Sequence, residues 1–118
     1  SKHPLIKKEA PEFINVKYEE QDSAVSIMTT TTDVQQCWLF YRYGESDFFH
    51  RVAMTRDGEQ ENEGVQEVNW LYEVPKQAGL QYYLVAEDKR TASLSPKKAA
   101  HEFHEVEVKE TDTASTGE

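Results

Sequence analysis

Apolar and polar residues alternate with a period of two along most of the chain, which is the pattern of half-buried β-strands. No stretch shows a sustained helical period. The alternating segments are separated by turn residues and span 13–19, 23–31, 36–43, 48–55, 65–74, 80–88 and 101–109. They predict an all-β protein built as an antiparallel β-sandwich of about seven strands.

Turn residues mark where the predicted strands end. Asp57-Gly58 is a strong turn signal, and Pro75 ends a strand because proline cannot donate to a β-ladder. The predicted connections are a tight turn at 44–47, a polar loop at 56–64 and a longer link at 89–100 that includes a short helical turn at 96–100.

The alternation also assigns a face to each side chain, because successive residues of a strand point to opposite sides of the sheet. In the 65–74 strand, Glu67 and Glu73 mark the outward face, so Trp70 is predicted to point inward. The predicted inward residues are Cys37, Leu39, Tyr41, Tyr43, Val52, Met54, Val68, Trp70, Tyr72, Val74, Leu80, Tyr82, Leu84 and Ala86.

Composition narrows the class of protein. The chain has 118 residues, and this length predicts one domain at 11–109, between a flexible segment at 1–10 and a disordered tail or linker at 110–118. The formal net charge of −9 argues against nucleic-acid binding, which needs a basic surface. No long apolar run exists, so we expect no membrane insertion. The first residues lack the apolar stretch of a signal peptide, so any export signal is expected outside this fragment.

Reactive side chains do not form a recognisable catalytic or metal motif, and we expect neither an enzyme nor a cofactor. Cys37 lies on a predicted inward face and is expected to act as a small core residue. Ser46, Asp47 and His50 are the residue types of a hydrolase triad, but turn chemistry explains them. His101 and His104 are expected on opposite strand faces as surface histidines, since a separation of three residues alternates sides.

An acidic segment is the weak candidate for metal binding. Carboxylates can ligate Ca²⁺, and four alternate within the predicted 56–64 loop: Asp57, Glu59, Glu61 and Glu63. Their spacing does not match the EF-hand loop, and the simpler interpretation is a solvated acidic loop.

Aromatic residues on one predicted outward face are the candidate binding site. Trp38, Phe40, Phe49, Tyr83 and Val85 fall on the outer side of strands that are neighbours in such sandwiches. An exposed aromatic patch marks an interface, either with a protein or with the rings of a sugar. The alternative is that a bulge shifts the faces or that the chain ends cover the patch. An exposed Trp38 also predicts that Trp38→Ala leaves stability nearly unchanged.

The strand sequences themselves resemble a known group. The segments Cys37-Trp38-Leu39-Phe40-Tyr41-Arg42, Val52-Ala53-Met54, Leu71-Tyr72-Glu73-Val74-Pro75 and Tyr82-Tyr83-Leu84-Val85-Ala86-Glu87-Asp88 resemble immunoglobulin-like or fibronectin type III-like sandwiches of secreted modular bacterial proteins. The immunoglobulin cysteine pair is missing, because Cys37 is the only cysteine.

The resemblance implies a function as well as a fold. It implies a non-catalytic accessory module of a larger exported bacterial protein, located outside the cell, on the cell surface or in the periplasm. Such a module would act as a spacer or as a contact for neighbouring domains or another protein. The alternative is a carbohydrate-binding module that uses the aromatic face to bind a glycan.

Overall fold

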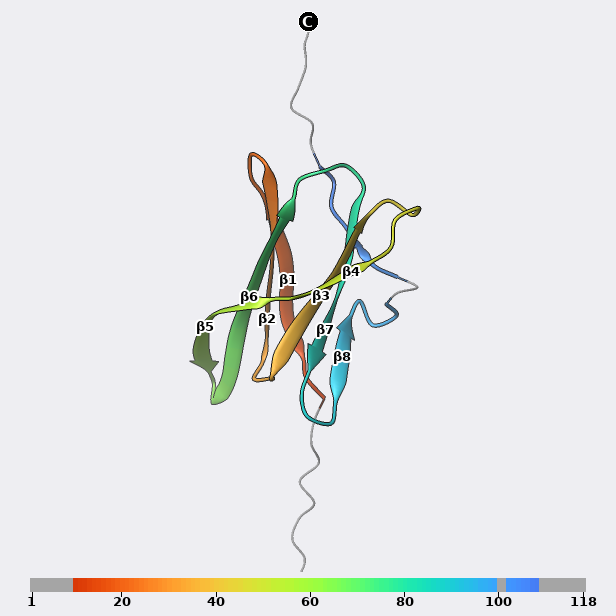
Figure 1. Ribbon diagram of the computed structural model, residues 1–118. Helices are drawn as coiled ribbons and strands as arrows, with labels where there is room; N and C mark the ends of the chain where they lie inside the picture. Colours follow the sequence, from red (N-terminus) through yellow and green to blue (C-terminus); the bar gives the residue numbers. More distant parts are fainter. Residues whose placement is uncertain (1–9, 100–101, 109–118) are drawn as a thin grey trace, which may run out of the picture.

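The structure is a computed structural model that describes residues 10–99 and 102–108 of the chain. It is an all-β sandwich of two antiparallel sheets, and no helix occurs among the described residues (Figure 1). The predicted segments 1–10 and 110–118 lie outside the described residues, apart from Ala10. The strands are β1 (Phe13–Glu20), β2 (Ala24–Thr32), β3 (Gln36–Tyr43), β4 (His50–Ala53), β5 (Thr55–Asn62), β6 (Val65–Pro75), β7 (Leu80–Glu87), β8 (Ala92–Ser95) and β9 (His104–Glu105).

The order of the strands confirms the predicted fold class. One sheet has the order β1-β2-β6-β5, and the facing sheet has the order β4-β3-β7-β8, with β9 also paired to β7. When β4 is lettered C′, the first sheet reads A-B-E-D and the second reads C′-C-F-G, which is the order of a constant-type immunoglobulin domain with one added strand. The chain therefore builds a two-sheet antiparallel β-sandwich, and its single cysteine leaves it without an internal disulfide.

The segment after β3 differs from the prediction, because the chain changes sheets at Met54. Residues 48–55 were predicted as one strand and 56–64 as a loop, whereas β4 pairs with β3 and β5 pairs with β6. Met54 is 4% exposed, and its amide donates to the carbonyl of Cys37 at 2.9 Å, which fixes the crossing in the interior.

The sequence signal for β5 is weak because this edge strand is exposed along its whole length and rich in charge. Charged residues on an edge strand discourage pairing with another chain, so they need no hydrophobic alternation. The predicted Asp57-Gly58 turn is instead a bulge, where the register shifts between Arg56 and Glu59 and Gly58 has a φ of 109°. The hairpin turns at Glu63, whose φ is 53°, and the following glycine.

The end of the chain also pairs differently from the prediction. A strand at 101–109 was predicted, but within the described residues 102–108 the strand is limited to β9, because β8 already occupies the edge of β7 from Leu84 to Glu87. The predicted link at 89–100 therefore contains a strand, and this prediction was wrong. The turn after it is present, since the amide of Ala99 donates to the carbonyl of Pro96 at 3.1 Å.

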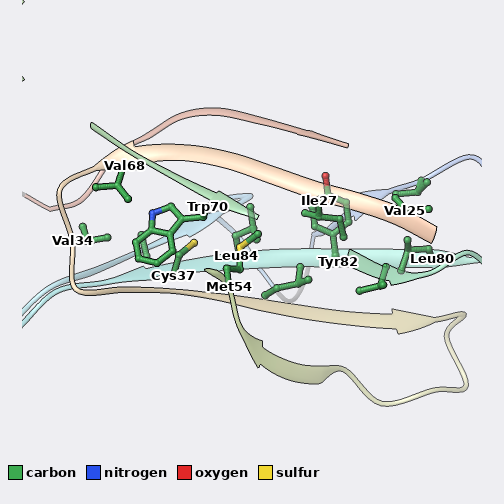
Figure 2. Packing of buried hydrophobic residues seen from close by; sticks show 14 residues of the cluster. Val25, Ile27, Val34, Cys37, Met54, Val68, Trp70, Leu80, Tyr82 and Leu84 are labelled. Atoms are coloured by element: carbon green, nitrogen blue, oxygen red, sulfur yellow. The ribbon is translucent and has the colours of Figure 1, made fainter. Parts of the chain in front are cut away.

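The core confirms the predicted inward faces of β3, β6 and β7. Figure 2 shows the indole of Trp70 among Val34, Cys37 and Val68, between the two sheets. Trp70 is 2% exposed and donates its Nε1–H to Thr31 Oγ1 at 2.9 Å. The fully buried members of the cluster include Val25, Ile27, Leu39, Val68, Leu84 and Ala86.

β1 departs from simple alternation at its start. Its register with β2 shifts between Phe13 and Asn15, so Ile14 is left 43% exposed while Phe13 and Val16 both pack against the core. A bulge inserts one residue and reverses the faces on one side of it, which the period of two does not reveal.

Candidate functional site

The outer face of the β4-β3-β7-β8 sheet gathers most of the predicted site residues. Phe40 lies directly between Arg51 of β4 and Tyr83 of β7 in the strand register. Trp38 lies next along β3, opposite Val85. These residues point away from the core because their neighbours along the strands are buried. We use "aromatic face" for the set Trp38, Phe40, Phe49, Tyr83 and Phe103 with Arg42 and Arg51.

The structure brings Phe40, Phe49 and Tyr83 together. The rings of Phe40 and Tyr83 stack with their centroids 4.6 Å apart and their planes at 4°. Phe49 meets Tyr83 edge-on at 4.9 Å, although it lies in the loop before β4. Burial among these rings raises the pKa of the Tyr83 hydroxyl. The cluster is therefore a packed unit, and its rings are half-buried.

Trp38 lies beside this cluster and has partners of its own. The guanidinium carbon of Arg51 lies 4.4 Å from the centre of the Trp38 ring system. The indole Nε1–H donates to Glu87 Oε1 at 2.8 Å. One ring face and the single polar hydrogen of Trp38 are thus already engaged within the chain.

Arg42 joins the aromatic face to the C-terminal segment. Its guanidinium carbon lies 4.4 Å from the centre of the Phe49 ring and 5.2 Å from that of Phe103. Its Nε–H donates to Gln81 Oε1 at 2.7 Å. Phe103 was not among the predicted site residues, because it was placed in a strand without an assigned face. Phe103 thus covers part of the patch.

A second aromatic that the sequence interpretation missed is Phe48. It is 84% exposed, next to Phe49 in the loop between β3 and β4. Asp47 shapes this loop, because its carboxylate accepts the amides of Tyr43 at 3.1 Å and of Phe48 at 2.8 Å. An exposed ring on a loop held by such hydrogen bonds extends the apolar surface beyond the sheet.

Two residues of the hypothetical triad, Asp47 and His50, have structural roles. Asp47 Oδ2 lies 3.3 Å from His50 Nε2, and the same carboxylate closes the turn. The backbone hydrogen bond from Tyr43, followed by those from Phe48 and His50, lowers the pKa of Asp47. Ser46 is exposed and forms no hydrogen bond with either residue within the described part of the chain. This arrangement is the chemistry of a turn, in agreement with the simpler interpretation.

The acidic candidates do not converge. Asp57, Glu59 and Glu61 lie along β5, and Glu63 lies in the turn that follows. Glu59 accepts a hydrogen bond from Arg56 at 3.2 Å and a second one from Gln66 at 3.1 Å. No group of three His, Cys, Asp or Glu side chains able to hold a metal ion occurs among the residues that the structure describes.

The remaining reactive groups lie in or near the core. Cys37 is fully buried, and this burial raises the pKa of its thiol to about 12. His104 was expected on the surface, but it is half-buried with its ring 5.0 Å from Tyr82 and its Nε2 3.0 Å from Ser95 Oγ. Burial lowers the pKa of His104. His101 lies outside the described residues.

A separate open cleft lies where β1 begins beside β8, with a volume of about 740 Å³. Its walls include Pro11, Phe13 and Pro96, and the Ser93 hydroxyl donates to the Pro11 carbonyl at 2.6 Å. The cleft combines a single cation, Lys97, with one carboxylate, Glu12. It offers shape without the set of polar groups that orients a ligand.

The described residues include no helix that is long and apolar enough to cross a membrane. Comparison of the chain with protein-family models, with curated proteins and with solved structures found no match.

Proposed function

We propose that this chain is a non-catalytic accessory module of a larger exported bacterial protein, and that it contacts neighbouring domains or another protein through the aromatic face. The observation that carries the proposal is the concentration of aromatic rings and arginines on one outer sheet face. Tryptophan, tyrosine and arginine are the residue types that contribute most to protein interfaces.

The outer face of the other sheet provides the contrast within the same molecule. It is covered by a polar network, in which Thr30 donates to Asn69 at 2.7 Å and Asn69 donates to Gln60 at 2.8 Å. Gln60 donates in turn to Glu67 at 3.0 Å. Thr30 and Glu67 of this network are 8% and 7% exposed, because the polar side chains cover one another. The composition of the aromatic face is therefore not a general property of the chain.

The positions of the chain ends support a spacer role. The described segments before β1 and after β9 leave the sandwich at opposite ends (Figure 1). Two domains attached at these opposite ends would be separated by the length of the sandwich. The aromatic face runs along the side, where a neighbouring domain or a partner can reach it.

We also propose that the chain is not an enzyme, because the candidate reactive groups have structural roles. The Cys37 thiol is buried with a raised pKa, and a nucleophile requires an accessible thiolate. Asp47 and His50 hold the loop that carries Phe48.

The alternative is carbohydrate binding on the same face. Sugars stack against free aromatic ring faces, but here Phe40 and Tyr83 stack on each other and Arg51 covers Trp38. The second face of Trp38 and the ring edges of the cluster are left for contact, and ring edges suit the side chains of a protein better than the plane of a sugar. This geometry favours the protein-contact function over the carbohydrate alternative.

A matched pair of variants tests the proposal. Phe40→Ala removes the centre of the aromatic face, and Leu71→Ala removes an apolar residue from the outer face of the other sheet. Binding is measured to the neighbouring domains of the longer reading frame and to a glycan array. We expect binding to protein that is lost in Phe40→Ala and kept in Leu71→Ala. Glycan binding with the same pattern of loss would establish the alternative, and equal binding by both variants would contradict both functions.

A further inference from the structure

Arg42 is a side chain of the aromatic face that contacts three separate segments of the chain. Two rings, Phe49 and Phe103, lie within 4.4 and 5.2 Å of its guanidinium carbon, and Gln81 accepts its Nε–H at 2.7 Å. Three contacts from separate segments fix the plane of the guanidinium before any partner arrives. Binding then loses less side-chain entropy than it would with a mobile arginine.

The outer donors of this arginine are left for another group. Among the described residues no carboxylate lies within salt-bridge distance of Arg42 or Arg51, although acidic residues outnumber basic ones by 22 to 13. Arg56 shows the usual outcome in this acidic chain, since it pairs with Asp33 at 3.5 Å and with Glu59 at 3.2 Å. The two arginines of the aromatic face are held by rings instead of by carboxylates.

We propose that Arg42, with Arg51 as a second anchor, binds carboxylates of an acidic and apolar segment of a partner protein. This inference rests on the proposed function and specifies the partner for the same face. The guanidinium fork donates two parallel hydrogen bonds to a carboxylate, which adds direction to the attraction between charges.

The placement of the two anchors describes the partner further. Arg51 leans over Trp38 at one end of the face, and Arg42 leans over Phe49 toward the other end. The stacked Phe40 and Tyr83 rings lie between these ends. A segment that fits has apolar side chains over the ring edges and an acidic residue on each side of them.

Charge favours a protein carboxylate over a nucleic acid. The chain carries a formal net charge of −9, which repels an extended polyanion, and two arginines do not make the basic stripe that phosphate backbones require. A short segment with separated carboxylates experiences less of this repulsion, because salt screens charges beyond about 8–10 Å.

The experiment uses an array of synthetic ten-residue peptides as the probe. Each peptide carries two glutamates that flank apolar residues, and matched arrays replace glutamate by glutamine or by phosphoserine. The whole chain is tested beside Arg42→Gln, Arg42→Lys and Arg90→Gln. Arg90→Gln is the control, because it makes the same change of charge at an exposed position in the turn between β7 and β8.

We expect the chain to bind glutamate peptides and to lose about tenfold to a hundredfold in affinity with glutamine peptides or in Arg42→Gln, as the loss of charge-assisted hydrogen bonds predicts. Arg42→Lys should recover only part of the affinity, because lysine keeps the charge but not the fork. Arg90→Gln should bind as the unaltered chain does, and added salt should weaken binding.

Other outcomes overturn the inference in distinguishable ways. Equal binding of glutamate and glutamine peptides, or equal binding by Arg42→Gln, refutes the role of Arg42. If Phe40→Ala still abolishes that binding, the proposed contact face survives without its acidic partner. Tighter binding of phosphoserine peptides assigns the site to phosphate instead of carboxylate. If no peptide binds at all, the acidic partner is refuted.

Phe103→Leu replaces Arg42→Gln as the test if Arg42→Gln fails to fold. It should weaken binding, because it frees the guanidinium of Arg42.

Discussion

The two tryptophans of the chain give the most informative stability prediction. Trp70 lies in the core between the sheets, and Trp38 lies on the outer face of the β4-β3-β7-β8 sheet. Trp70 is 2% exposed in the core, and its indole N–H donates to Thr31. Trp70→Ala removes this ring and leaves a cavity, which costs about 3–5 kcal/mol. The lost hydrogen bond adds about 1 kcal/mol at most, since the Thr31 hydroxyl still donates to the carbonyl of Thr32 at 2.8 Å.

Trp38→Ala is expected to be much milder. The ring is half-buried, and its removal loses the contact with Arg51 and an exposed hydrogen bond to Glu87. A cation–π contact near the surface contributes about 0.5–1 kcal/mol, so we expect a total loss of about 1–2 kcal/mol. This is more than the near-neutral change that an exposed Trp38 would give.

Urea unfolding of both variants, followed by far-ultraviolet circular dichroism, measures the difference. Circular dichroism is preferred to fluorescence because each substitution removes half of the tryptophans. Comparable m-values are required for the free energies of unfolding to be compared. A larger loss in Trp38→Ala than in Trp70→Ala would mean that the faces of β3 and β6 are reversed, and the aromatic face would be an interior.

Three further predictions concern single positions. The Cys37 thiol, with its pKa raised to about 12, should react with a thiol reagent only on unfolding, and rapid labelling of the native chain would contradict its burial. Gly79→Ala should destabilise by about 1–3 kcal/mol and more than Gly64→Ala, because both have positive φ but a Cβ at 79 would lie 3.3 Å from the Gly44 amide nitrogen. Burial lowers the pKa of His104, so the unfolded chain binds that proton first and stability should fall as the pH drops through about 6.5. Denaturation of His104→Gln should show a smaller fall, and an equal fall would assign it to other groups.

The strands that carry a hydrophobic pattern could be predicted from the sequence. The limits of β3 match the prediction, and its buried residues alternate because one side faces the core. β5 could not be found this way, since it buries nothing and is identified only by its pairing with β6. The change of sheet at Met54 is likewise a tertiary property, because residues on both sides of it read as one extended segment.

The candidate site was predictable in its positions and not in its contacts. Alternation places Phe40 and Tyr83 outward, and the register then makes them neighbours. No local pattern shows that Phe103 returns to the same face across a long connection, or that Arg42 lies against it. Such contacts depend on where the chain end crosses the sheet, which is decided by the competition of β8 and β9 for the edge of β7.

The aromatic face is the proposed contact surface of this module. The test is a set of amide nuclear magnetic resonance spectra of the labelled chain, recorded alone and with the proposed neighbouring domains. We predict shifts concentrated on the outward positions of β3, β4 and β7, together with the Nε–H signal of Arg42. Shifts concentrated on the polar face of the β1-β2-β6-β5 sheet, with the Arg42 signal unmoved, would contradict it.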